Sequence, residues 1–149
     1  YKHFVKETLK NVTEKIALFG RRLMLGEKLT KRVLAENTLK HFNLFNFVTT
    51  KCKIVETVLY LPFISTKRDY GILGCHWSAH KQDLLAINGF DEDYKTYGVG
   101  EGVGVEWRMK ESGIKFKSLK FKAIQYHLYH PLNSTGDAFN IEVLKEKRN

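Results

Sequence analysis

Residues 81–118 read KQDLLAINGFDEDYKTYGVGEGVGVEWRMKESGIKFKS, and this stretch decides the fold class. It predicts a short helix over 81–87 that ends at Asn88-Gly89, because both residue types accept the left-handed conformation found after helices. A second helix is predicted over 103–112 and ends at Gly113 for the same reason. Apolar residues and lysines then alternate, as in a half-buried strand. Helices and strands that alternate along a chain indicate an α/β or α+β protein.

The remainder of the chain adds further helices and strands, predicted from the spacing of its apolar residues. No internal repeat and no low-complexity linker divides them, so we expect one continuous unit. The additional helices are predicted over 2–18, 27–36 and 38–48, the additional strands over 21–25, 54–61 and 72–78, and the lysine-bearing strand over 114–123.

The chain has 149 residues and a formal net charge of +9. A basic balance is typical of proteins that meet nucleic acid, anionic membranes or phosphorylated substrates. Residues 71–110 differ from the rest, because they hold six acidic and four basic side chains. Carboxylates gathered in a basic chain indicate metal binding or acid–base chemistry, and an ordinary solvated surface is the alternative.

The apolar runs are far too short to span a membrane. Cys52 and Cys75 are too few and too far apart for a disulfide framework or a zinc ribbon. We therefore expect a soluble protein in a reducing, cytoplasmic setting. The chain begins at Tyr1 without a methionine, inside a predicted helix, which favours a fragment of a longer protein.

The acidic side chains between residues 91 and 106 are candidate ligands for Mg²⁺ or Mn²⁺, or a candidate general base. A solvated loop or a helix cap is the alternative. Gly102 and Gly104 are unusual beside them, because the first turn of a helix normally favours Asp or Glu. The acidic candidates are Asp91, Glu92, Asp93, Glu101 and Glu106.

Two histidines and several aromatic residues complete the candidate set. His127 and His130 share a metal if the chain turns at Pro131, whereas in an extended strand they would face opposite sides. A structural role is the alternative for both. Aromatic rings such as Trp77 and Tyr97 stack on sugar rings, and core packing is the alternative for the tryptophan.

Four motifs occur in a fixed order between residues 71 and 131. They are Gly74-Cys75-His76-Trp77-Ser78, Asp83-Leu84-Leu85-Ala86-Ile87-Asn88-Gly89-Phe90-Asp91-Glu92, Gly98-x-Gly100-Glu101 and Tyr126-His127-Leu128-Tyr129-His130-Pro131. Together they resemble the C-terminal part of family 2 glycosyltransferases, most closely the galactosyltransferase-like C-terminal domain. Residues 1–70 fit the same family more loosely, through Phe19-Gly20-Arg21-Arg22.

The resemblance implies an α/β fold of the GT-A type, with a mixed sheet flanked by helices and the front nucleotide-binding half absent from this chain. Residues 1–70 would be a helix-rich connecting segment of the same catalytic domain, 71–131 the galactosyltransferase-like region, and 132–149 a C-terminal tail. The implied activity is hexose transfer from a nucleotide-diphosphate sugar to a glycan or lipid-linked acceptor in surface polysaccharide synthesis. The implied cofactor is Mn²⁺ or Mg²⁺. Peripheral association with the inner face of a membrane would suit such an acceptor, and no nucleic acid partner is expected.

The resemblance also assigns roles to the acidic motif. Glu101 matches the glutamate of a Glu-Asp pair and would orient the acceptor. The aspartate of that pair is the family's expected general base, and here its position holds Gly102, which cannot take a proton. This departure puts transferase activity of the chain in question. An ungapped count from Asn88-Gly89 instead places Glu101 at the base position.

The binding residues follow in the same way. His130 is the expected metal ligand, with His127 second. His76, Trp77, Asn88, Gly89 and Tyr97 would shape the substrate pocket, although His76 stands where the family usually has asparagine.

Two other interpretations stay open. The chain is then either a degenerate, non-catalytic member that binds sugar or supports a partner subunit, or a basic polyanion-binding module that uses the lysines at 115–122.

Overall fold

The computed structural model describes residues 3–65, 72, 74–94, 101–131 and 137–147. Its helices are α1 (Phe4–Asn11), α2 (Glu27–Glu36), α3 (Leu44–Thr49), α4 (Lys81–Ala86), α5 (Glu101–Glu111) and α6 (Asp137–Glu146), with a 3₁₀ helix at Val55–Val58. Its strands are β1 (Ile16–Phe19), β2 (Arg22–Met24), β3 (Trp77–Ser78), β4 (Lys115–Ser118) and β5 (Gln125–His127). The predicted α/β class, with a mixed sheet flanked by helices, is confirmed.

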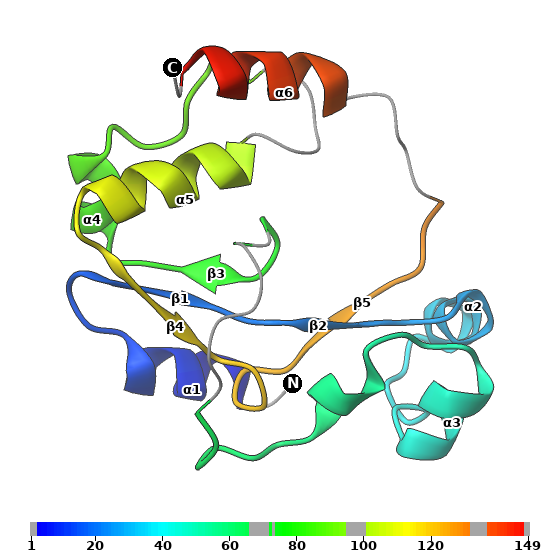
Figure 1. Cartoon of the computed structure of the whole chain (residues 1–149). Helices are drawn as coiled ribbons and strands as arrows, with labels where there is room; N and C mark the ends of the chain where they lie inside the picture. The colour runs from blue at the N-terminus through cyan, green and yellow to red at the C-terminus, as the bar shows by residue number, and fades with distance from the viewer. Residues whose placement is uncertain (1–2, 66–71, 73, 95–100, 132–136, 148–149) are drawn as a thin grey trace.

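The strand β1 is the centre of the sheet. It pairs antiparallel with β3 and parallel with β4, in the order β3-β1-β4. Only Gly20 and Arg21 separate β1 from β2, which pairs parallel with β5. The two chain segments 16–24 and 115–127 therefore run side by side in the same direction (Figure 1).

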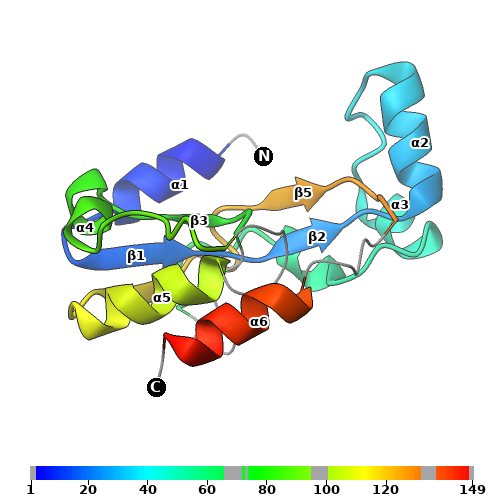
Figure 2. The same cartoon turned by 90° about the horizontal axis from the view of Figure 1, so that it is seen from above.

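Helices cover both faces of β1. Figure 1 shows α5 above the sheet and α1 below it, and Figure 2 again places them on opposite sides. Neighbouring residues of a strand point to opposite faces, so Ala17 and Leu18 serve different layers. Ala17 packs in the cluster that contains α5, and Leu18 packs in the cluster that contains Phe4 of α1.

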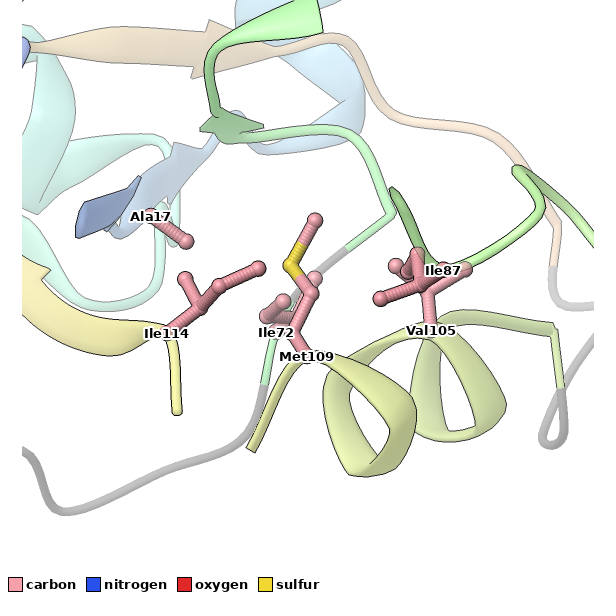
Figure 3. Close-up of a cluster of buried hydrophobic side chains, with 6 residues drawn as sticks. All are labelled: Ala17, Ile72, Ile87, Val105, Met109 and Ile114. Atoms are coloured by element: carbon pink, nitrogen blue, oxygen red, sulfur yellow. The ribbon is translucent and has the colours of Figure 1, made fainter. Parts of the chain in front are cut away.

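The core beneath α5 joins elements from most of the sequence. Val105 and Met109 of α5 are fully buried against Ala17 of β1, together with Ile72, Ile87 and Ile114. Figure 3 shows Met109 in the middle of this cluster. Burying a side chain of that size contributes about 2 kcal/mol relative to leaving it exposed. The core thus fixes α5, and with it Gly102 and Gly104, against the sheet.

A separate cluster attaches α2 and α3 to β2. Leu23 and Leu25 pack against Leu29 and Val33 of α2 and against Phe47 of α3. Met24 also exchanges backbone hydrogen bonds with Lys53, with N···O distances of 3.1 and 2.9 Å. The segment 44–53 is therefore held at the end of β2 (Figure 2).

The predicted helix over 2–18 is wrong in its second half. The helix stops at Asn11, and Ile16–Phe19 is the central strand β1. The continuous apolar run Ile-Ala-Leu-Phe suits a strand buried on both faces, and pairing on both edges outweighs its helical spacing. Lys15, at φ 59°, makes the turn between the two elements.

Three other predicted segments are shorter than expected or of another type. The predicted helix over 38–48 forms only as α3, and the predicted strand over 54–61 contains the 3₁₀ helix instead. Of the described residues in the predicted strand over 72–78, only Trp77–Ser78 forms a strand. For the segment over 54–61, local apolar content was present, but no strand forms there in the described part of the chain.

The lysine-bearing strand also divides. β4 ends at Ser118, residues 119–124 turn with Phe121 at φ 68°, and β5 follows. Lys122 is buried and Lys120 lies 3.7 Å from a carboxylate oxygen of Glu56. The lysines at 115–122 therefore do not form the single exposed face that the prediction of one strand required.

The helices predicted within 81–118 and over 27–36 formed as expected. α2 has the predicted bounds, and α4 and α5 lie within one or two residues of theirs. Asn88, Gly89 and Gly113 have φ of 62°, 66° and 74°, the left-handed conformation from which the stops were predicted. The region expected to be a tail contains α6, and no described helix is long and apolar enough to cross a membrane.

A buried histidine packs on the junction between β1 and β2. The ring of His76 is 3% exposed, and its Nδ1 lies 2.9 Å from the carbonyl oxygen of Arg21. A Cβ placed on Gly20 would come within 2.1 Å of this ring. Gly20 is therefore glycine because the imidazole occupies the space of its side chain.

We predict that Gly20→Ala destabilises the protein by about 1–3 kcal/mol, the usual effect of overpacking a filled core. In a His76→Ala background the same substitution should be nearly neutral, because the space is vacant. Urea unfolding of the four variants measures this coupling. Gly74→Ala is the matched control, since a Cβ there meets no atom of the described residues within 4 Å. An equal loss of stability in both backgrounds would contradict the contact.

Burial lowers the pKa of His76, while its backbone hydrogen bond with Arg21 acts in the opposite sense. The folded state thus keeps the ring neutral to lower pH than the unfolded state, whose pKa is about 6.5. The neutral ring therefore contributes to the free energy of unfolding at pH values above the pKa of the unfolded state. This contribution is lost as the pH falls through the pKa of the folded state.

We therefore expect the melting temperature to fall more steeply between about pH 7.5 and pH 5 in the wild type than in His76→Asn, which keeps a δ-position donor but does not titrate. Parallel melting profiles for the two proteins would show that His76 does not control this dependence.

Candidate active site

The two predicted metal-site histidines meet at the end of β5. Their Nε2 atoms are 3.0 Å apart, and their ring centroids are 5.0 Å apart. β5 ends at His127, so His130 lies outside the paired strand, and both rings reach the same place. The sequence left open whether they would face opposite sides, and the structure brings them together.

The hydrogen bonds of His130 indicate which of its atoms is free to bind a ligand. Its Nδ1 lies 2.9 Å from the carbonyl oxygen of Pro131, so we assign the proton of the neutral ring to Nδ1. The lone pair of Nε2 then points toward His127. Burial lowers the pKa of His127, and the positive charge of Arg22 lowers it further. His127 is therefore favoured in the neutral form that binds metals.

Two imidazole rings alone do not make a complete metal site. Among the residues that the structure describes, no group of three or more His, Cys, Asp or Glu side chains is close enough to hold an ion. The pair fits a cation such as Mn²⁺ whose further ligands are supplied by a substrate or by residues outside the described set.

A pocket of about 510 Å³ lies beside the histidine pair. Its walls come from β2, the N-terminus of α2, the loop after α3, and the residues that end β5. The lining is strongly basic, and its charged and titratable members include Arg22, Lys28, Lys51, Lys53, His127 and His130.

Backbone contacts give this pocket a fixed shape. Leu25 donates its N–H to the carbonyl of His127 at 2.8 Å, and Tyr129 donates its N–H to Thr30 Oγ1 at 2.9 Å. A Cβ on Gly26 would lie 1.7 Å from the carbonyl oxygen of Thr50, so glycine allows the loop to touch the start of α2. The walls are thereby held together across more than 100 residues of sequence.

Gly102 and Gly104 lie in the first turn of α5 and differ in the space around them. Among the described residues, a Cβ on Gly102 would meet only the carbonyl oxygen of Ile72, at 3.7 Å. A Cβ on Gly104 would lie 3.0 Å from the ring of Tyr94. Gly102 therefore has room for a side chain, whereas the ring of Tyr94 occupies the space beside Gly104. Glu101 begins α5, and its side chain lies outside the described set.

The N-terminus of α5 and the histidines lie on one side of the molecule. Figure 1 shows α5 running back against the direction of β4, so that it begins on the side where β2 and β5 end. Ligand sites of α/β sheets commonly occupy this side, at the carboxyl ends of the strands.

Most of the predicted acidic candidates have structural partners. Glu106 is buried, accepts the N–H of Ile72 at 2.6 Å and pairs with Lys110 at 2.8 Å. Asp91 and Asp93 both bind Lys147, which follows α6. The hydrogen bond from the Lys147 ammonium group lowers the pKa of Asp91. Because Lys147 follows α6, its ion pairs with the two carboxylates attach that helix. Glu92 is exposed.

The predicted substrate-pocket residues are spread over several places. His76 is buried under the sheet and presents no exposed edge to a sugar. Trp77 is half-buried against the α5 core and contacts the exposed ring of Phe90 edge-on, with centroids 6.1 Å apart. Tyr97 lies outside the described residues. For these three residues, substrate binding stays a prediction.

Asn88 and Gly89 form the C-terminal turn of α4. Gly89 donates to the carbonyl of Leu84 at 2.9 Å, and the Arg108 guanidinium donates to the carbonyl of Ile87 at 2.6 Å. The pair thus has a clear local role in ending the helix. Its role in a substrate pocket also stays a prediction.

Sequence reasoning missed the cations of the pocket. Lys51 and Lys53 lie in a segment predicted as the approach to a strand, and nothing local indicates that Lys53 pairs with Met24. The two arginines at 21–22 were the one feature of the sequence that could have indicated a basic pocket, because they closely follow a buried strand.

The comparisons with known proteins agree with the motif analysis at a coarse level. Residues 62–131, 70 of the 149, match the family model described as the N-terminal domain of galactosyltransferase. Searches of curated proteins and of solved structures each found no match. The matched segment includes α4, α5, β4, β5 and both histidines of the pair. The chain therefore contains a glycosyltransferase-like domain that is similar to a galactosyltransferase.

Proposed function

We propose that the protein is a GT-A glycosyltransferase of the family 2 type, which transfers a hexose from a nucleotide-diphosphate sugar to a glycan or lipid-linked acceptor in surface polysaccharide synthesis. The match of residues 62–131 to a galactosyltransferase family model carries this proposal. Cytoplasmic location at the inner face of a membrane belongs to the same proposal.

The histidine pair supports the proposal through its chemistry. His130 and His127 would hold Mn²⁺ or Mg²⁺ through the Nε2 atoms that lie 3.0 Å apart. Bound there, the ion would neutralise charge on the diphosphate that leaves the sugar. His130 is oriented for this by Pro131, whose carbonyl fixes the proton on Nδ1.

The start of α5 would meet the acceptor. Glu101 would orient the acceptor hydroxyl, and Trp77 with Tyr97 would line the sugar site. An inverting transfer needs a base to remove the hydroxyl proton, and Gly102 stands at the position where the family places one. This single absence favours a second candidate function, a non-catalytic member that binds sugar.

Restoring the missing carboxylate tests the two functions against each other. Gly102→Asp should fold with little change in stability, because a Cβ there has room and an acidic residue suits the first turn of a helix. Gly104→Asp should lose about 1–3 kcal/mol by displacing Tyr94. Chemical unfolding of both variants checks this difference, and equal stabilities would contradict the packing around Gly104.

Transfer of labelled hexose from UDP-sugars to a mixed glycan acceptor is then measured for the wild type and for Gly102→Asp. A gain of about tenfold or more would support a lost base, since general-base catalysis typically contributes at least that much. Donor binding without transfer in either protein would support the sugar-binding function. If neither protein binds the donor and neither transfers hexose, both candidate functions are overturned.

Mn²⁺ binding provides a test that does not depend on activity. His127→Ala and His130→Ala should each weaken Mn²⁺ binding by about tenfold or more, because each removes a ligand. Calorimetric titration or the signal of free Mn²⁺ in electron spin resonance measures this. His80→Ala, at the start of α4, is the control and should bind as the wild type does. Unchanged binding in both pair variants would remove the histidines from the metal site.

A further inference from the structure

The basic pocket is built largely by residues outside the segment that matches galactosyltransferase. Arg22, Lys28, Lys51 and Lys53 all precede residue 62, whereas His127, Tyr129 and His130 belong to the matched segment. The pocket therefore joins a shared part, which includes the histidine pair, to a part that the family model does not cover.

The lysines of the pocket have no acidic partner in the part of the chain that the structure describes. Among the described residues, no carboxylate lies within ion-pair distance of the Lys28, Lys51 or Lys53 side chains. Glu27, which also lines the pocket, pairs with Lys31 at 2.6 Å. Like charges that converge on one concave surface repel one another, and an anionic ligand relieves that repulsion.

The backbone of the pocket favours the same kind of ligand. No side chain caps the N-terminus of α2, which opens onto the pocket at Gly26, Glu27 and Lys28. Free N–H groups and the helix dipole favour phosphate at such a position, and lysine supplies the point charge that phosphates bind. Arg22 lies on β2, and its guanidinium donates to Cys75 Sγ at 2.8 Å. It adds a planar hydrogen-bond donor to the pocket.

We propose that this pocket binds a phosphate group of the acceptor, so that the enzyme extends a phosphorylated sugar or a sugar linked to a lipid through a diphosphate. The inference rests on the proposed transferase function. Because the cations come from the part of the chain that the galactosyltransferase model does not match, we assign the phosphate to the acceptor and not to the donor. Met24 and Leu25, which also line the pocket, suit the apolar surface beside such a phosphate.

Inorganic pyrophosphate is the first probe, titrated calorimetrically into the 149-residue protein in the presence of EDTA so that no metal bridges it. We expect binding, and we expect Lys51→Gln/Lys53→Gln to weaken it by about tenfold or more, because charge-assisted hydrogen bonds are lost. Both lysines are exposed, so the variant should fold. Lys28→Gln, on α2, provides an independent variant with the same expected direction.

The matched control is Lys115→Gln/Lys117→Gln, which removes the same charge from β4 and should bind pyrophosphate as the wild type does. Absence of binding, or equal weakening by the control, would overturn the inference. Displacement of pyrophosphate by UDP would also overturn it, because the pocket would then hold the donor diphosphate.

A hexose phosphate in solution and vesicles that carry a prenyl-diphosphate-linked sugar distinguish the two acceptor sources. Binding of either one, dependent on Lys51 and Lys53, supports the inference, and binding of neither overturns it. Pyrophosphate binding without any hexosyl transfer would fail the proposed function and leave the phosphate site standing. Hexosyl transfer that is unchanged in Lys51→Gln/Lys53→Gln would support the transferase function and overturn the phosphate site.

Discussion

The parallel pairing of residues 16–24 with residues 115–127 is the constraint on which the rest of this structure depends. β1 and β2 each find a partner in β4 and β5, and the interruptions of the two segments, at Gly20-Arg21 and at 119–124, fall side by side. Gly20 is essential to this junction because the buried His76 ring fills the space beside it. A larger residue at position 20 would separate β1 from β3, since Gly20 also donates its N–H to the carbonyl oxygen of His76.

The same pairing places the candidate site. Because β2 and β5 run in one direction, their ends lie together, and so the basic side chains near β2 and the histidines after β5 line one pocket. The crossover from α5 into β4 returns the start of that helix to the same side (Figure 1). Side chains that are far apart in the sequence therefore line one pocket.

The acidic region predicted to carry chemistry proves to be mainly structural. Glu106 holds the backbone at Ile72, and Asp91 and Asp93 hold Lys147. These contacts leave the histidine pair and the basic pocket as the groups available to a ligand. The contacts with Lys147 also explain why the segment 137–147, expected to be a tail, packs as a helix.

The sequence by itself determined the elements that neighbouring residues decide. α2, α4 and α5 follow from apolar spacing and from glycine or asparagine stops, and the galactosyltransferase resemblance follows from motifs within 71–131. Only the tertiary structure decided that Ile16–Phe19 is a strand, that His127 and His130 meet, and that Lys51 and Lys53 join them. The physical reason is that strand pairing and pocket formation depend on contacts between residues up to about 100 positions apart, and local patterns carry no record of such register.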